Sequence, residues 1–211
     1  MMAILDLDSI HLIKDFPVDQ YYPQSTDKNQ IVLHHTVSGP GVFGDINWWK
    51  QTPERIATHF IIARDGTIYQ CFNSRYWAHH LGVKTSVFRK FNLRNTNRLL
   101  NAGSISIEYD SWGGVDNNTR YHGPVEHYPK GYRGYTKFER YTAEQIESSR
   151  QLLEYFGKKY DIPLSYNADM WDVSKRALQG TPGVWSHGSF RPDKSDCHPQ
   201  PELVEMLQSF E

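Results

Sequence analysis

Four side chains that could bind or polarise a ligand lie within a dozen residues of one another near the C-terminus. They are His187, Lys194, Asp196 and Cys197. Histidine, aspartate and cysteine are the usual zinc ligands, and a catalytic zinc site takes about three of them and leaves one position open. The stretch therefore predicts part of a metal site with a positive charge beside it, and a further ligand must come from elsewhere in the chain.

The best candidate for that ligand is a pair of histidines at the end of an apolar run. Residues 30–36 are rich in β-branched side chains, and we predict a buried strand that delivers its last side chains to the site. Successive side chains of a strand point to opposite faces, so only one of His34 and His35 can be a ligand. Most buried histidines are ordinary core residues, so spacing alone leaves the metal site a hypothesis.

The same alternation orders the candidates near the C-terminus. If residues 194–196 are extended, Lys194 and Asp196 project together and Cys197 points away. This geometry favours Asp196 as the third ligand. Cys197 stays an alternative, because zinc also accepts sulfur readily.

Another carboxylate lies on a strand predicted at residues 104–110. Apolar and polar residues alternate strictly there, so Glu108 shares a face with Ser106 and Asp110. A glutamate in such a pattern is most commonly a solvated edge residue. On the residues alone, Trp77 and His80 also fit ordinary packing.

The remaining periodic segments predict an α/β fold in which helices flank a mixed central sheet. Further strands are expected at residues 58–62, 68–72 and 184–187. The first two form a hairpin through the Asp65-Gly66 turn. Helices are expected at residues 42–50, 142–160 and 202–207, and Thr142 with Gln145 resembles a capping box for the longest one.

We expect a single domain over residues 30–211, with residues 1–29 packed on it as an N-terminal arm. A long loop or small insertion is expected at about 111–140, because this segment is rich in Gly, Tyr and Asn. Residues 73–103 and 165–183 are also expected to be irregular.

The composition excludes several classes of function. The chain has 211 residues, 38% of them hydrophobic, which suits one domain with one core. A net charge of −1 gives no basic field for nucleic acid or an anionic membrane. The two cysteines are too few for a disulfide scaffold. Residues 1–17 resemble neither a signal peptide nor a membrane span, so we expect a protein that is cytoplasmic at synthesis.

Six segments, in order, resemble the zinc-dependent N-acetylmuramoyl-L-alanine amidases of the type 2 amidase family. That family shares its fold with phage lysozyme-amidases and peptidoglycan recognition proteins. The matching segments are residues 31–36, 58–68, 77–82, 104–108, 186–187 and 194–196. The resemblance covers about residues 30 to 207 and implies the peptidoglycan recognition protein fold.

The resemblance implies that zinc is held by His34, His187 and Asp196. Other branches of the family carry a cysteine at the third position, which keeps Cys197 in question. The implied reaction is hydrolysis of the amide between the lactyl group of N-acetylmuramic acid and L-alanine. Glu108 would be the general base, and Lys194 would stabilise the oxyanion.

Three more residues are implied near the substrate: His80 and Trp77 in a cleft wall, and His59 on the second strand. Some family members carry a tyrosine immediately before that histidine, where this chain has Thr58. Because the tyrosine assists catalysis where it is present, its replacement implies that catalysis depends more strongly on Glu108.

We therefore expect a monomeric phage endolysin that acts on peptidoglycan, with neither nucleic acid nor membrane as a partner. A cytoplasmic amidase that recycles soluble anhydro-muropeptides is an alternative from the same class. A non-catalytic peptidoglycan-binding module is an alternative from another class. A closed structural metal site would need a fourth protein ligand, which His198 or Cys197 could supply.

Overall fold

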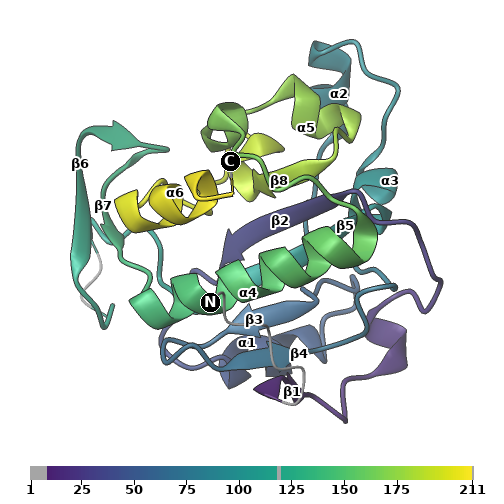
Figure 1. Cartoon of the computed structure of the whole chain (residues 1–211), viewed down its shortest axis with the longest axis horizontal. Helices are drawn as coiled ribbons and strands as arrows, with labels where there is room; N and C mark the ends of the chain where they lie inside the picture. Colours follow the sequence, from purple (N-terminus) through teal and green to yellow (C-terminus); the bar gives the residue numbers. More distant parts are fainter. Residues whose placement is uncertain (1–8, 118–119, 211) are drawn as a thin grey trace.

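The computed structural model describes residues 9–117 and 120–210, and a six-stranded mixed sheet runs through its centre (Figure 1). The strand order is β1-β4-β3-β5-β2-β8. These strands are β1 (His11–Leu12), β2 (Gln30–His35), β3 (Phe60–Ile62), β4 (Ile68–Gln70), β5 (Ser104–Tyr109) and β8 (Gly183–Ser186). The expected class, a single α/β domain with helices flanking a mixed sheet, is confirmed.

The central strand β2 pairs in parallel with both β5 and β8. All six of its residues are buried, as expected for a parallel strand that is covered on both faces. β3 also runs parallel to β5, whereas β3 and β4 form the antiparallel hairpin expected from the Asp65-Gly66 turn. The parallel strands therefore bring their C-terminal ends to one edge of the sheet.

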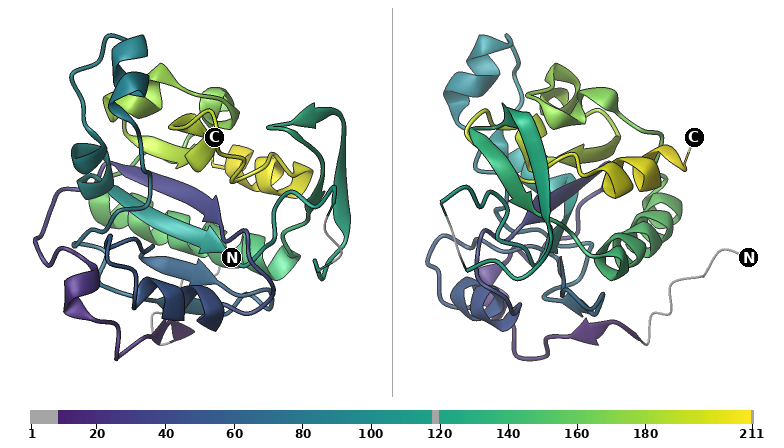
Figure 2. Two further views of the ribbon diagram at one scale, coloured as in Figure 1. Left: turned by 180° about the vertical axis from the view of Figure 1, so that it is seen from behind. Right: turned by 90° about the vertical axis from the view of Figure 1, so that its left-hand side faces the viewer.

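Helices cover both faces of the sheet. The long helix α4 (Ala143–Tyr160) lies across one face, and Figure 2 shows α1 (Phe43–Trp49) on the other. Strand β3 divides its side chains accordingly: Phe60 and Ile62 belong to the core under α4, and Ile61 packs with the cluster that contains Ile46 of α1. Two apolar cores thus fix the sheet from opposite sides.

A local signal explains where α4 begins. The Thr142 side chain accepts a hydrogen bond from the Gln145 amide, and the Gln145 side chain accepts one from the Thr142 amide. This reciprocal pair satisfies two amides that the first turn of a helix leaves unbonded. The predicted capping box is confirmed, as is the terminal helix, which is α6 (Pro201–Gln208).

Two segments that were predicted to be irregular contain short helices. Residues 73–103 contain α2 (Thr85–Lys90) and α3 (Asn97–Ala102). Residues 165–183 contain the 3₁₀ helix η3 (Ala168–Trp171) and α5 (Lys175–Gln179). Helices of four to six residues are too short to show an apolar period. Side-chain caps define two of them, since Thr96 accepts from Leu99 and Ser174 accepts from Ala177. The prediction of irregular structure was wrong at these positions.

The segment at 111–140, expected to be a long loop or a small insertion, carries a hairpin that projects to one side of the sheet (Figure 1). It consists of β6 (Val125–Tyr132) and β7 (Tyr135–Glu139). Arg133 and Gly134 both have positive φ, of 48° and 89°, which is the geometry of a tight two-residue hairpin turn. Most of its side chains are at least partly exposed, so no apolar alternation marked these strands in the sequence.

Part of the predicted N-terminal arm, residues 1–8, lies outside the described residues. From residue 9 onward, β1 pairs with β4 at the edge of the sheet, and the 3₁₀ helix η2 (Val18–Gln20) follows. Phe16 is buried in the cluster around α1. Among the described residues, no helix combines the length and the apolar character needed to cross a bilayer.

Candidate metal centre and active site

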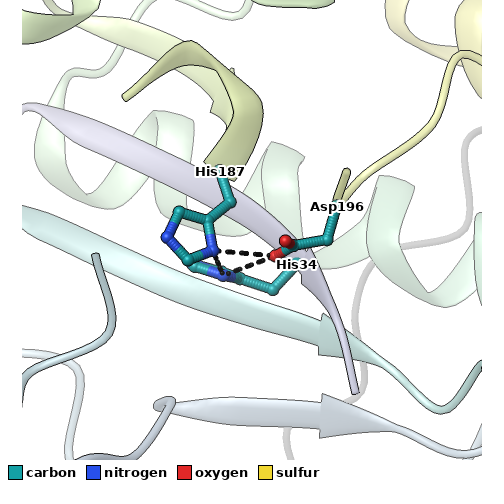
Figure 3. Close-up of side chains that lie close together, drawn as sticks. All are labelled: His34, His187 and Asp196. Carbon is teal, nitrogen blue, oxygen red and sulfur yellow. Dashed lines mark hydrogen bonds and ion pairs between the residues drawn. The ribbon is translucent and has the colours of Figure 1, made fainter. Parts of the chain in front are cut away.

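Two histidines and an aspartate converge at the edge of the sheet where the parallel strands end (Figure 3). His34 is the penultimate residue of β2, and His187 begins the 3₁₀ helix η4 (His187–Ser189) directly after β8. Asp196 comes from the loop before α6. Because β2 and β8 are parallel neighbours, both histidines reach the same corner of the molecule.

The converging atoms are the Nδ1 atoms of the two histidines and Oδ2 of Asp196. The two Nδ1 atoms lie 3.1 Å apart, and Oδ2 lies 3.2 Å from His34 and 2.9 Å from His187. A tetrahedral site with bonds of about 2.0–2.1 Å has ligand–ligand edges of about 3.3 Å. The three atoms therefore fit around one ion with only a small expansion.

The hydrogen bonding of His187 supports a cation at this position. Its Nε2 lies 2.8 Å from the carbonyl oxygen of Leu81, which can only accept, so Nε2 carries the proton. In the neutral ring Nδ1 then carries a lone pair, which faces the carboxylate of Asp196. Two acceptors at 2.9 Å repel each other unless a cation or a proton lies between them. The two histidine nitrogens and the carboxylate oxygen therefore suit a divalent metal ion, to which each can offer a lone pair.

The protonation of the other two groups also suits metal binding. Burial acts to raise the pKa of Asp196, but His187 and His34 outweigh it and hold that pKa well below its usual range. Burial, with His187 adding to it, lowers the pKa of His34 to about 4. At neutral pH the site thus offers a carboxylate and a neutral imidazole, the forms that metals bind.

A cavity of about 790 Å³ opens beside these residues, and Glu108 and Lys194 both line it. Glu108 is the register partner of His34 on the parallel strand β5, so the two side chains lie on the same face. Burial raises the pKa of Glu108 well above its usual value, and the carboxylates of Asp196 and Asp45 add to that effect. A carboxylate with a raised pKa is a stronger base.

The cavity wall also contains residues that the sequence did not single out. Asp45 and Trp48 come from α1, and the Trp48 side chain is 55% exposed. Burial raises the pKa of Asp45 to about 6, against a hydrogen bond that Ser38 donates to its carboxylate. Asp45 and Trp48 each come one position before a buried residue of α1, Ile46 and Trp49. This spacing was the signal in the sequence that could have identified them.

The structure brings only one of the three expected substrate residues to the cavity. His80 lines it, and its Nδ1 lies 3.0 Å from Nε2 of His34. Trp77 is 2% exposed and stacks on Tyr22 at 3.9 Å between ring centroids. His59 is fully buried.

His59 bonds instead to the Ser106 hydroxyl and to the Tyr76 carbonyl. Neither Trp77 nor His59 lies on the wall of this cavity, because protein atoms enclose both rings.

The alternative ligands also lie elsewhere. Cys197 is fully buried beside Tyr141, and burial raises the pKa of its thiol well above its usual value. His198 bonds to the hydroxyl of Tyr128 and the carbonyl of Glu139, and Nδ1 of His35 lies 2.8 Å from the hydroxyl of Tyr141. Within residues 9–117 and 120–210, the candidate group contains three ligands, which leaves a coordination position for water or substrate.

Comparison with solved structures shows that other proteins share this fold. LysCS, an endolysin N-acetylmuramoyl-L-alanine amidase from Clostridium intestinale URNW, is 17% identical, with a TM-score of 0.52 and coverage of 98% of each chain. AmpD is 17% identical, with a TM-score of 0.54 and coverage of 97% of this chain and 99% of its own. A mutant endolysin from Bacillus subtilis is 17% identical, with a TM-score of 0.54 and coverage of 95% of each chain.

A search of curated proteins returned no match. The family model described as N-acetylmuramoyl-L-alanine amidase, however, matches residues 24–200, a span that includes all three metal-site residues and Glu108 and Lys194. The resemblance seen in the six sequence segments is therefore confirmed, and the chain belongs to the N-acetylmuramoyl-L-alanine amidase family.

Proposed function

We propose that this enzyme is a zinc-dependent peptidoglycan amidase in which His34, His187 and Asp196 hold the metal. The observation that carries the proposal is the convergence of three buried acceptor atoms within 3.2 Å of one another, beside the cavity that Glu108 and Lys194 line. The bond to be cut is the amide between N-acetylmuramic acid and the L-alanine of the stem peptide. Membership of the amidase family supports this choice of bond.

Zinc, when bound, supplies a Lewis acid and lowers the pKa of a water molecule toward neutrality. Glu108 takes the proton of the attacking water and transfers it to the nitrogen of the leaving L-alanine. Its position opposite His34 in the register of β2 and β5 places it beside the metal ligands without making it one of them. The raised pKa of Glu108 makes it an effective proton acceptor that can later donate.

Lys194 stabilises the negative charge that develops on the carbonyl oxygen. Lys194 lines the cavity, two residues before the proposed ligand Asp196. A single donor to an oxyanion is worth about 3 kcal/mol of transition-state stabilisation. Lys194 therefore contributes to rate rather than to metal binding.

The proposed natural substrate is the intact cell wall, so the protein would act as a phage endolysin. Two of the similar solved structures described above are endolysins, which supports this choice. The proposal includes synthesis in the cytoplasm and action on the wall as a monomer. Cleavage of soluble anhydro-muropeptides, as in a recycling amidase, is the alternative to be tested directly.

The test combines metal analysis with digestion of purified sacculi and of soluble anhydro-muropeptides, scored by the release of free L-alanine amino groups. We expect about one zinc per chain and faster cleavage of sacculi. Glu108→Ala should retain zinc and lose most hydrolysis, because the base is not a ligand. Glu54→Gln, which changes another carboxylate of the same cavity, is the matched control and should stay active.

Glu108→Ala cleaving sacculi at the rate of the unmodified enzyme would disprove the assigned base. A purified protein that binds no zinc would disprove the metal centre. A clear preference for anhydro-muropeptides would replace the endolysin role with the recycling role and leave the reaction unchanged.

A further inference from the structure

The hydroxyl of Ser104 has a fixed direction because of its surroundings. Ser104 begins β5 and is fully buried, and its hydroxyl donates to the carbonyl oxygen of Leu100 at 2.7 Å. The carbonyl oxygen of Asn101, at 3.4 Å, is a second group that can only accept. A hydroxyl has one proton to donate, and both carbonyls compete for it, so the remaining contact of this oxygen must be as an acceptor. That contact is with Nε2 of His80, at 2.8 Å. Nε2 of His80 therefore carries a proton.

The fixed proton on Nε2 determines what the other side of the His80 ring does. In the neutral imidazole Nδ1 is then an acceptor, and it lies 3.0 Å from Nε2 of His34. His34 must donate in this contact, so its own proton is on Nε2. The lone pair of His34 is consequently on Nδ1, the atom that faces His187 and Asp196.

We propose that Ser104 and His80 form a hydrogen-bonded relay that holds His34 in the tautomer able to bind the metal. His80 is in this view a positioning residue that acts through His34. The inference rests on the proposed function, because it concerns the ligands of the proposed zinc site. A histidine that ligates a metal commonly donates its other ring N–H to a fixed acceptor, and such partners affect affinity strongly.

Leu81, the residue after His80, fixes the tautomer of the other histidine, His187. The carbonyl oxygen of Leu81 accepts the proton of Nε2 of His187, which leaves Nδ1 of that ring free for the metal. Two consecutive residues, His80 and Leu81, thus set the tautomers of both metal-site histidines. One acts through its side chain, the other through its backbone.

A buried asparagine of α3 holds this pair of residues in place. Oδ1 of Asn101 accepts the backbone N–H groups of His80 at 2.7 Å and of Leu81 at 3.1 Å. Its Nδ2 donates to the carbonyl oxygen of Asn97, at 2.6 Å, and Asn101 is fully buried. The relay is therefore anchored to α3 as well as to β5.

The test measures zinc affinity by competition with a chromogenic chelator and the tautomer of His34 by ¹⁵N NMR of the metal-free protein. His80→Leu removes the acceptor for His34, and we expect its affinity for zinc to fall about 10–100-fold. His80→Asn keeps an oxygen near the position of Nδ1, and we expect affinity within about threefold of the unmodified protein. The contrast separates loss of the acceptor from loss of the ring.

Ser104→Ala frees the His80 ring to take either tautomer, so we expect a mixture of His34 tautomers and a loss of zinc affinity of about 10-fold. Ser106→Ala is the matched control. Ser106 is an equally buried serine two residues along the same strand, and its hydroxyl bonds to His59 instead of His80. It should change neither the tautomer of His34 nor the affinity for zinc.

The outcomes separate the relay from the proposed function. If the unmodified protein binds no zinc, the metal centre itself is wrong. If it binds zinc, but His80→Leu binds equally tightly or metal-free His34 carries its proton on Nδ1, the relay is overturned and the metal centre stands. Equal losses in Ser104→Ala and Ser106→Ala, with an unchanged tautomer, would also overturn the relay.

Discussion

Replacing Asn101 by alanine tests how far the support of the metal site extends into the fold. The side chain of Asn101 is fully buried in α3 and makes hydrogen bonds at both ends. Its oxygen accepts two backbone N–H groups, and its nitrogen donates to α3 itself. Alanine removes all of these partners.

The expected cost follows from the groups left without partners. The N–H groups of His80 and Leu81 and the carbonyl of Asn97 each lose a partner in or near the interior. An unpaired buried polar group costs about 1–3 kcal/mol, and the contacts of His80 and Asn97 are only partly buried, so we expect a loss of about 2–5 kcal/mol in the free energy of unfolding. For a chain of this size the loss lowers Tm by roughly 4–20 °C.

The assay is urea unfolding of the metal-free protein, followed by a zinc titration of the folded variant. Asn95→Ala is the control, because this nearby asparagine bonds to the carbonyl of Leu178 and not to residues 80–81. It should cost about 1 kcal/mol and leave zinc affinity unchanged. Asn101→Ala should weaken zinc binding as well, since it loosens the partners of both metal-site histidines. A loss below about 1 kcal/mol with unchanged affinity would refute this reasoning.

Three further predictions concern the site itself. His187→Ala should lose both zinc and hydrolysis, and full metal occupancy by elemental analysis would contradict the ligand set. Lys194→Met should keep zinc but lower kcat about 100-fold, in line with about 3 kcal/mol for one oxyanion donor; an unchanged kcat on sacculi would contradict its role. Burial raises the folded-state pKa of Glu108 above its unfolded value of about 4.5, so the folded metal-free protein binds the extra proton and loses stability as pH rises through the folded pKa. Glu108→Gln should therefore stabilise the metal-free protein by about 0.5–2 kcal/mol at pH 8 and by little at pH 4, and an equal effect at both pH values in chemical denaturation would exclude this origin.

The central strands could be predicted because their signals are local. β2 contains a continuous apolar run at residues 31–33 and is buried on both faces, and β5 shows strict alternation. The two-residue period of β5 also predicted the face on which Glu108 lies, and the register with β2 then places it beside His34. The capping box of α4 is likewise contained within four residues.

The short elements could not be predicted, because their stability comes from contacts distant in sequence. α3 has only six residues, and its buried Asn101 is a polar residue that is matched to backbone groups about 20 positions earlier. The hairpin of β6 and β7 exposes most of its side chains and so lacks an apolar pattern. The burial of Trp77 and His59 away from the cavity could not be predicted for a similar reason, because the partners that bury them lie on other segments.

The candidate metal site shows most directly what a residue pattern can encode. His34 is separated from His187 by 153 residues and from Asp196 by 162, yet all three are among the candidates that the residues offer, because only a few side-chain types bind metal. The carbonyl of Leu81, which orients His187, has no such signature, since every residue carries a carbonyl group. The sequence encodes its position indirectly, through Asn101, whose side-chain oxygen fixes the backbone of residues 80–81. In the proposed relay, the choice of ligand atom therefore depends on an asparagine that contacts neither His34 nor His187, and this is why its replacement should weaken zinc binding as well as folding.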